Sequence, residues 1–188
     1  MYLDRRGSGL GAMGLCVCLA VAGLAFAQDK SQSTYKSDDG RLTFWSPATP
    51  KKTSDLVPGK EQKTYRRTTY AVQMPNYLLL ASVLDLGDDP PTTGDEQAYL
   101  GSMVESLTAN MGEQFVLDPR EGQTRLHYGG NGFPGRQVKG TLEGQQLIIR
   151  SFVAPRRIYT FQVGYQLGDQ KAAADGQRFL ASVVINDS

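Results

Sequence analysis

The chain has 188 residues, of which 40% are hydrophobic and 21% are charged, and its formal net charge at pH 7 is +1. This composition is that of one ordinary globular domain and excludes an intrinsically disordered chain. The near balance of charge excludes a strong overall attraction to nucleic acid or to anionic lipid. With a single histidine and two cysteines, the chain also offers little for zinc binding.

The first 27 residues have the layout of a secretory signal peptide. Arg5 and Arg6 precede an uncharged apolar run that ends in the small-x-small triplet Ala25-Phe26-Ala27. We expect cleavage after Ala27. An uncleaved membrane anchor is the alternative, because the run approaches the roughly 20 residues that cross a bilayer. The sequence therefore predicts an exported protein, periplasmic or extracellular, with no stable membrane insertion after cleavage.

Cleavage changes both the thiol content and the charge. Cys16 and Cys18 lie in the segment to be removed, so the mature chain would have no disulfide and no thiol nucleophile. Of the 20 basic and 19 acidic side chains, Arg5, Arg6 and Asp4 are lost, which leaves 18 of each sign. The neutral mature domain is not expected to bind nucleic acid.

The mature chain begins with a polar stretch, residues 28–40, which predicts a flexible leader before a single domain over 41–188. Residues 41–46 predict a short strand. The next stretch, 47–61, carries three prolines and a glycine and predicts a long connection. Threonine and tyrosine are frequent in 62–72, which favours a strand.

Residues 77–86 are apolar at both strand parities, which predicts a strand covered on both faces. The period changes over 95–111, where apolar side chains recur at three- and four-residue spacing and predict a helix. Thr93 and Glu96 form a capping box at its start, and Gly112 is its expected end.

The rest of the chain predicts antiparallel hairpins followed by a second helix. Four strand candidates, 123–128, 135–143, 145–153 and 157–167, are separated by glycine- or proline-bearing turns. The amphipathic segment 169–183 then packs back onto the sheet. We therefore predict an α+β fold, an antiparallel sheet flanked by helices on both faces in an α-β-α sandwich.

Residues 129–135, GGNGFPG, contain a G-x-G-x-x-G pattern, but the surrounding sequence argues against a dinucleotide site. Such glycines must join a strand to a helix whose N-terminus meets the pyrophosphate. Here Pro134 interrupts the pattern and a hairpin-like sequence follows. We interpret the segment as a turn between strands and expect no cofactor.

Catalytic and metal-binding patterns are equally weak. Asp85, Asp89 and Glu96 match three positions of an EF-hand loop, but Gly87 and Pro90 break the pattern, so we expect no metal. A Ser-His-Asp arrangement would require His127, which lies among strand residues and is more simply a structural histidine. The sequence therefore predicts a protein that is not an enzyme.

Arginines beside strand aromatics are the remaining candidates for a site. We interpret these arginines first as charges that protect sheet edges from aggregation, with a groove for an anionic group as the alternative. The candidate binding surface consists of Arg66, Arg67, Arg136, Arg157 and Tyr159.

Several stretches resemble secreted domains of the PsbP-like superfamily. They are DGRLTFWSPATP at the start, the helix between strands, the GFPGRQVKG turn, Arg157-Ile158-Tyr159 and the closing FLASVVI. The resemblance spans roughly residues 35–186 and implies an antiparallel sheet between helices. PsbP proteins of plants and cyanobacteria are extrinsic subunits of photosystem II, and a eukaryotic relative binds the GTPase Ran, so the fold serves unrelated partners. No functional residue of either matches a position here.

Three functions remain open from the sequence. The first is an exported, non-enzymatic binding or accessory domain with an envelope or extracellular protein as partner. The second is a small-ligand carrier or sensor with a pocket between the sheet and the 95–111 helix. The third is a hydrolase that uses His127 and one acid near residues 85–96.

Overall fold

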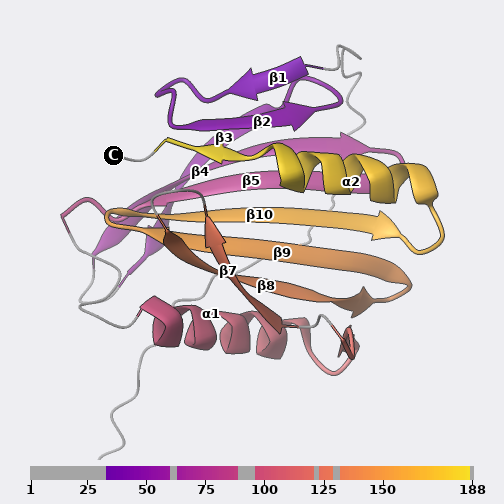
Figure 1. Ribbon diagram of the computed structural model, residues 1–188. Coiled ribbons are helices and arrows are strands. Elements are labelled where there is room, and N and C mark those ends of the chain that lie inside the picture. The colour runs from indigo at the N-terminus through magenta and orange to yellow at the C-terminus, as the bar shows by residue number, and fades with distance from the viewer. Residues whose placement is uncertain (1–32, 60–62, 89–95, 121–122, 129–131, 187–188) are drawn as a thin grey trace, which may run out of the picture.

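The computed structural model describes residues 33–59, 63–88, 96–120, 123–128 and 132–186. The expected signal peptide lies outside these residues. Eleven strands and two helices occur within the described ranges. Five strands precede α1, five lie between α1 and α2, and one follows α2 (Figure 1). Their bounds are β1 Ser33–Lys36, β2 Leu42–Ser46, β3 Lys51–Pro58, β4 Thr64–Met74, β5 Tyr77–Asp85, α1 Glu96–Met111, β6 Phe115–Leu117, β7 Gln123–Tyr128, β8 Phe133–Leu142, β9 Gln145–Ala154, β10 Arg157–Gln166, α2 Gln170–Ser182 and β11 Val184–Ile185.

The main sheet has the strand order β3-β4-β5-β10-β9-β8-β6. β7 pairs with residues 133–138 of β8, along the same edge that holds β6 at residues 140–142. All of its pairs are antiparallel. Chain order explains much of this arrangement, because short turns join neighbouring strands. Between β8 and β9 the turn residues Glu143 and Gly144 have φ of 49° and 79°, the positive values that tight two-residue hairpins require. β10 then closes against β5 and joins the two sets of hairpins.

Helix α1 covers one face of the sheet at β8 and β9. Leu100, Val104 and Leu107 on this helix are buried, as the predicted spacing requires, and two of them pack on Val138 and Ile149. Gly112, with φ of 73°, ends the helix in the left-handed conformation. The predicted helix and its C-terminal end are confirmed. Thr93, the expected cap, lies outside the described residues.

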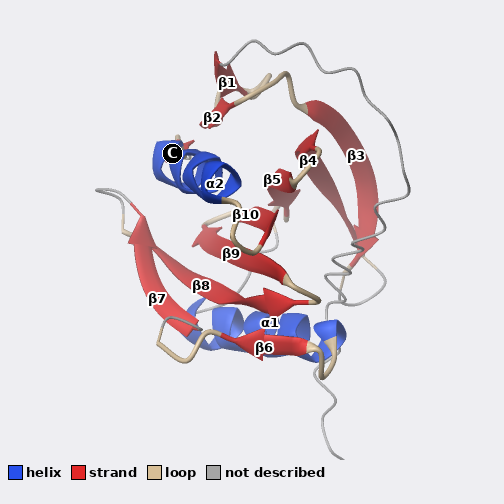
Figure 2. Ribbon diagram, turned by 90° about the vertical axis from the view of Figure 1, so that its right-hand side faces the viewer, coloured by secondary structure: helices blue, strands red, loops and turns tan. Residues whose placement is uncertain are grey.

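Helix α2 covers the opposite face, together with a small sheet of order β1-β2-β11 (Figure 2). Asp169 caps its first turn, since its carboxylate accepts a hydrogen bond from the Ala172 N–H at 2.9 Å. Phe179 packs edge-on against Phe44 of β2, with ring centroids 5.4 Å apart. The predicted α-β-α sandwich is therefore confirmed. Neither described helix is long and apolar enough to span a membrane.

Three details differ from the sequence prediction. Residues 33–36, expected in the flexible leader, form β1 and pair with β2. Residues 51–58, expected in a long connection, form β3, an edge strand exposed along most of its length. On β5, Leu79 and Ala81 are buried on the α2 side, but Leu78 and Leu80 on the α1 side are only half-buried, because α1 lies over β8 and β9. The composition of these segments did not indicate which strands would pair with them or which helix would cover them.

Candidate functional site

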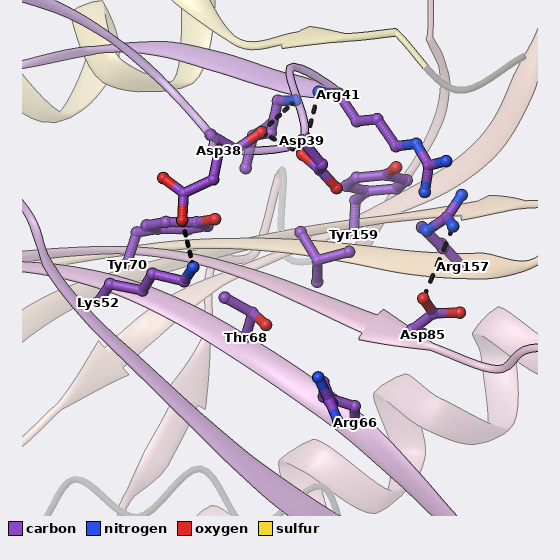
Figure 3. A pocket seen from close by; sticks show the side chains of 13 residues that line it. Asp38, Asp39, Arg41, Lys52, Arg66, Thr68, Tyr70, Asp85, Arg157 and Tyr159 are labelled. Carbon is purple, nitrogen blue, oxygen red and sulfur yellow. Dashed lines mark hydrogen bonds and ion pairs between the residues drawn. The ribbon is translucent and has the colours of Figure 1, made fainter.

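A polar pocket of about 200 Å³ lies on the α2 side of the sheet, between the β1–β2 turn and strands β3, β4, β5 and β10 (Figure 3). We call it the Arg-rich pocket. Four cationic and three carboxylate side chains line it, so its net formal charge is one positive. The lining residues are Ser37, Asp38, Asp39, Arg41, Leu42, Lys52, Arg66, Thr68, Tyr70, Val83, Asp85, Arg157 and Tyr159.

The β1–β2 turn forms the upper wall of this pocket through a small hydrogen-bond network. The buried Ser37 hydroxyl donates to Asp39 Oδ1 at 2.6 Å and accepts from the Leu42 N–H at 3.0 Å. The Arg41 N–H donates to the same Asp39 oxygen at 3.1 Å. These bonds fix the turn and the backbone at Arg41.

The Asp39 carboxylate is held in its charged form. Burial alone would raise its pKa, but hydrogen bonds from the Ser37 hydroxyl and the Arg41 N–H, together with the charges of Arg41 and Arg157, outweigh burial and lower the pKa. The turn therefore remains negatively charged at neutral pH. This charge is electrostatically favourable for the nearby guanidinium groups of Arg41 and Arg157.

Two ion pairs neutralise part of the pocket. Lys52 on β3 bonds the Asp38 carboxylate, which raises the pKa of Lys52. Arg157 lies 3.6 Å from Asp85, and its side chain is only 13% exposed. Arg66 makes no ion pair or side-chain hydrogen bond with the described part of the chain. It is exposed and lies opposite Asp85 in the β4–β5 register (Figure 3). The exposed Arg66 guanidinium can therefore bind an incoming carboxylate.

The predicted binding surface is divided between the two faces of the sheet. Arg66, Arg157 and Tyr159 come together in the Arg-rich pocket. Arg67 follows Arg66 on β4, so it points to the α1 side, where it bonds Asp55 of β3 at 3.1 Å. Arg136 also lies on the α1 side, packed near Gly101 of α1, and its buried Nε has no hydrogen-bond partner among the described residues.

Tyr159 is not a surface residue, because its side chain is fully buried in the core cluster and forms part of the pocket floor. Four lining residues that the sequence did not indicate complete the charged wall. They are Asp38, Asp39, Arg41 and Lys52, which come from the expected leader, the start of the first predicted strand and the expected connection. The cluster of charges in residues 38–41 was the only available signal.

The residues discussed as catalytic or metal-binding do not form a site in the described parts of the chain. His127 lies on β7 opposite Pro134. Asp85 lies on β5, four strand spacings away through β8, β9 and β10, or about 19 Å at 4.8 Å per spacing. Asp85 is paired with Arg157, Asp89 is outside the described residues, and within the described ranges no group of three potential metal ligands occurs.

The glycine pattern at 129–135 joins two paired strands. Residues 129–131 lie outside the described ranges, but Tyr128 of β7 faces Phe133 of β8, so a strand and not a helix follows the glycines. At Gly135 a Cβ atom would lie 2.4 Å from the Phe152 ring. This glycine therefore serves the close packing of β8 on β9.

Comparison with solved structures identifies the architecture. The chain superimposes on the solution structure of cyanobacterial PsbP (CyanoP) from Synechocystis sp. PCC 6803 with a TM-score of 0.50, covering 88% of this chain and 98% of that one. The chain has a PsbP-like fold. Sequence identity over the alignment is 11%, and neither a family model nor a curated protein sequence matches the chain. The resemblance noted in the sequence is thus confirmed at the level of the fold.

In this PsbP-like fold, the space between α1 and the sheet is filled. Val104 and Leu107 contact Val138, Leu147 and Ile149, and all five are at most 5% exposed. Met103, Met111 and Phe115 fill the margins of the same cluster. These side chains therefore fill this part of the interface between the sheet and the 95–111 helix, where a ligand pocket was expected.

Proposed function

We propose that the protein is an exported, non-enzymatic accessory domain that binds an envelope or extracellular protein through the Arg-rich pocket. The observation that carries the proposal is the convergence of Arg41, Arg66 and Arg157 on one hollow with a tyrosine floor. Arginine and tyrosine are the residue types most enriched at the centres of protein interfaces.

The charges of the pocket favour an acidic segment on the partner. Asp85 pairs with Arg157, Asp39 adds a negative charge near Arg41, and the accessible Arg66 can pair with a carboxylate in the forked geometry of guanidinium recognition. The lining contains no histidine or cysteine, and its serine is already bonded to Asp39. This composition supports recognition more than nucleophilic chemistry.

A photo-crosslinking experiment in the source organism tests this proposal. Leu56 lies opposite Arg66 in the β3–β4 register and is 66% exposed, so a crosslinking amino acid there reports contacts at the mouth of the pocket. Leu167 is 50% exposed at the other end of β10, about 30 Å from Arg157, and is the matched control position. We expect one envelope protein to be captured at Leu56 and not at Leu167.

Charge reversal makes the test specific to the pocket. Arg66→Glu is expected to abolish capture at Leu56, whereas Arg120→Glu, an exposed arginine outside the pocket, should leave it unchanged. Capture that survives Arg66→Glu would refute the role of the pocket.

The mass of the same purified protein tests export, because cleavage after Ala27 predicts a chain that begins at Gln28.

A further inference from the structure

A second pocket, of about 250 Å³, lies between the C-terminal end of α2 and strand β7 on the α2 side of the sheet. It shares no residue with the Arg-rich pocket. In Figure 2, β7 rises from the edge of the main sheet toward the level of α2, and both elements contribute residues to the lining of this pocket, as do β9 and β10. The lining residues are Leu126, Arg150, Phe152, Phe161, Leu180, Ala181 and Val183. We call this the Arg150 pocket.

Arg150 is the one charged residue in this lining. It pairs with Phe161 across β9 and β10 and with Gln137 across β8 and β9, so its side chain is on the α2 face. Its Nε donates to the Gln137 amide oxygen at 2.8 Å. Among the described residues, Gln137 is its one hydrogen-bond partner and no carboxylate pairs with it.

Arg150 is half-buried, so part of its side chain is withdrawn from water. Burial lowers the pKa of Arg150, although the group remains charged at neutral pH. A desolvated charge is costly unless an opposite charge compensates it. Gln137 supplies a neutral acceptor only, so the Arg150 site has unused capacity for an anion.

The walls define the rest of the ligand. Phe152 and Phe161 lie with ring centroids 6.2 Å apart, and Leu126, Leu180 and Val183 complete an apolar enclosure. A volume of about 250 Å³ is below the range of about 300–1,000 Å³ typical of sites for drug-sized ligands. An inorganic anion would leave the apolar walls without contact, and a neutral apolar molecule would leave Arg150 without a counter-charge.

We propose that the Arg150 pocket binds a small monocarboxylate whose hydrocarbon chain or ring lies between Leu126 and Leu180. The carboxylate pairs with the terminal nitrogens of the guanidinium, in the forked geometry that arginine offers to this group. This inference is independent of the protein partner proposed for the Arg-rich pocket.

The test is a titration of the isotope-labelled protein followed by NMR. The probes are octanoate and 3-phenylpropionate, with 1-octanol and inorganic phosphate as the matched neutral and non-apolar controls. We expect saturable shifts at the Arg150 side chain and at the amides of Phe152 and Ala181 with both carboxylates. Octanol should bind at least about tenfold more weakly than octanoate, because it lacks the charge-assisted hydrogen bonds, and phosphate should give no saturable shift.

Two variants make the proposal falsifiable. Arg150→Gln removes the charge and should raise the dissociation constant for octanoate about tenfold or more. Arg178→Gln, an arginine of α2 that lies over the Trp45 ring outside the pocket, should leave that constant within about twofold. Ala181→Leu fills the pocket from an exposed position and should weaken binding without disturbing the fold.

The contradicting results are equally definite. Equal affinity for octanol and octanoate, or an unchanged dissociation constant in Arg150→Gln, would show that the guanidinium does not recognise the carboxylate. Shifts confined to residues outside the pocket, unaffected by Ala181→Leu, would place any binding elsewhere. No shift with either carboxylate at millimolar concentration would overturn the proposal.

Discussion

Gly101 in α1 and Gly176 in α2 both lie inside helices, yet replacement by alanine should change the free energy of unfolding in opposite directions at the two positions. A Cβ atom at Gly176 would lie 2.5 Å from Cγ1 of Val163, a fully buried residue of β10. At Gly101 the nearest atom would be the end of the Arg136 side chain at 3.7 Å, an ordinary contact. We expect Gly176→Ala to reduce the free energy of unfolding by about 1–3 kcal/mol through overpacking. Gly101→Ala should raise it by about 0.5–1 kcal/mol through helix propensity.

Urea denaturation of the two variants measures both effects. In a double-mutant cycle, Val163→Ala should offset part of the cost of Gly176→Ala, since it removes the clashing methyl groups. Additive free energies for these two changes would show that α2 moves away from the sheet to accommodate the new methyl group.

Asp39 gives the Arg-rich pocket a defined response to acid. Its pKa is lowered in the folded protein, so its stabilising contribution is complete above the unfolded value of about 3.9. That contribution is lost as the pH falls from there through the lower folded pKa. The stability difference between the unmodified protein and Asp39→Asn should therefore be largest at neutral pH and shrink toward pH 3. A constant difference in urea midpoint across this range would contradict the charged network at the β1–β2 turn.

Strand parity explains how much of the site was predictable from sequence. Arg66 and Arg157 could be singled out because arginines beside aromatics are visible in the sequence. The sequence could not show which of Arg66 and Arg67 enters the pocket, although adjacent strand residues point to opposite faces. The pairing of Arg67 with Asp55 depends on the β3 register, which the sequence does not reveal. The contributions of Asp39 and Arg41 depend on a turn that packs over the sheet, and no local pattern encodes that contact.

At the scale of elements, β1 is integral to the fold. Tyr35 packs against Phe44 and Tyr70, with ring centroids 5.3 Å and 5.4 Å apart. A chain that begins at Arg41 should therefore have a free energy of unfolding lower by about 1–3 kcal/mol than one that begins at Gln28, because two aromatic pairs contribute about 0.5–1.5 kcal/mol each. Tyr35→Ala in the longer chain should reproduce most of this loss. Equal stability of the two chains would mean that residues 28–40 are a leader without a structural role, as the sequence predicted.

The elements that the sequence missed are those stabilised mainly by a neighbouring strand. β3 carries Lys51, Asp55 and Pro58 and has almost no buried side chain, so neither alternation nor hydrophobicity marks it. It forms because β4 offers an unpaired edge along eight residues. The two helices and β7 to β10, by contrast, carry their own apolar periodicity or turn residues, and the sequence predicted each of them.

At the scale of the whole molecule, the sheet separates two unlike faces. On the α1 side, the side chains of the helix fill the space over β8 and β9, while the α2 side retains both the Arg-rich pocket and the Arg150 pocket. The helix order of the sequence predicted two covered faces but not this asymmetry. It arises because α2 is 13 residues long and packs over β2, β10 and β5, which leaves Arg66 of β4 exposed at one side and Arg150 of β9 only half-buried at the other.

The same arrangement predicts a gradient of local stability across the sheet. β10 is hydrogen-bonded to β5 on one side and to β9 on the other, and its Tyr159, Phe161 and Val163 are at most 1% exposed beneath α2. Its amides should therefore exchange with solvent only through global unfolding, whereas the edge strands β3 and β6 should exchange through local opening at much lower free energy. Native-state hydrogen exchange at increasing urea concentration checks this order. Slow exchange in β3 would contradict it and would mean that this exposed edge is paired in solution, which would make β3 part of an interface.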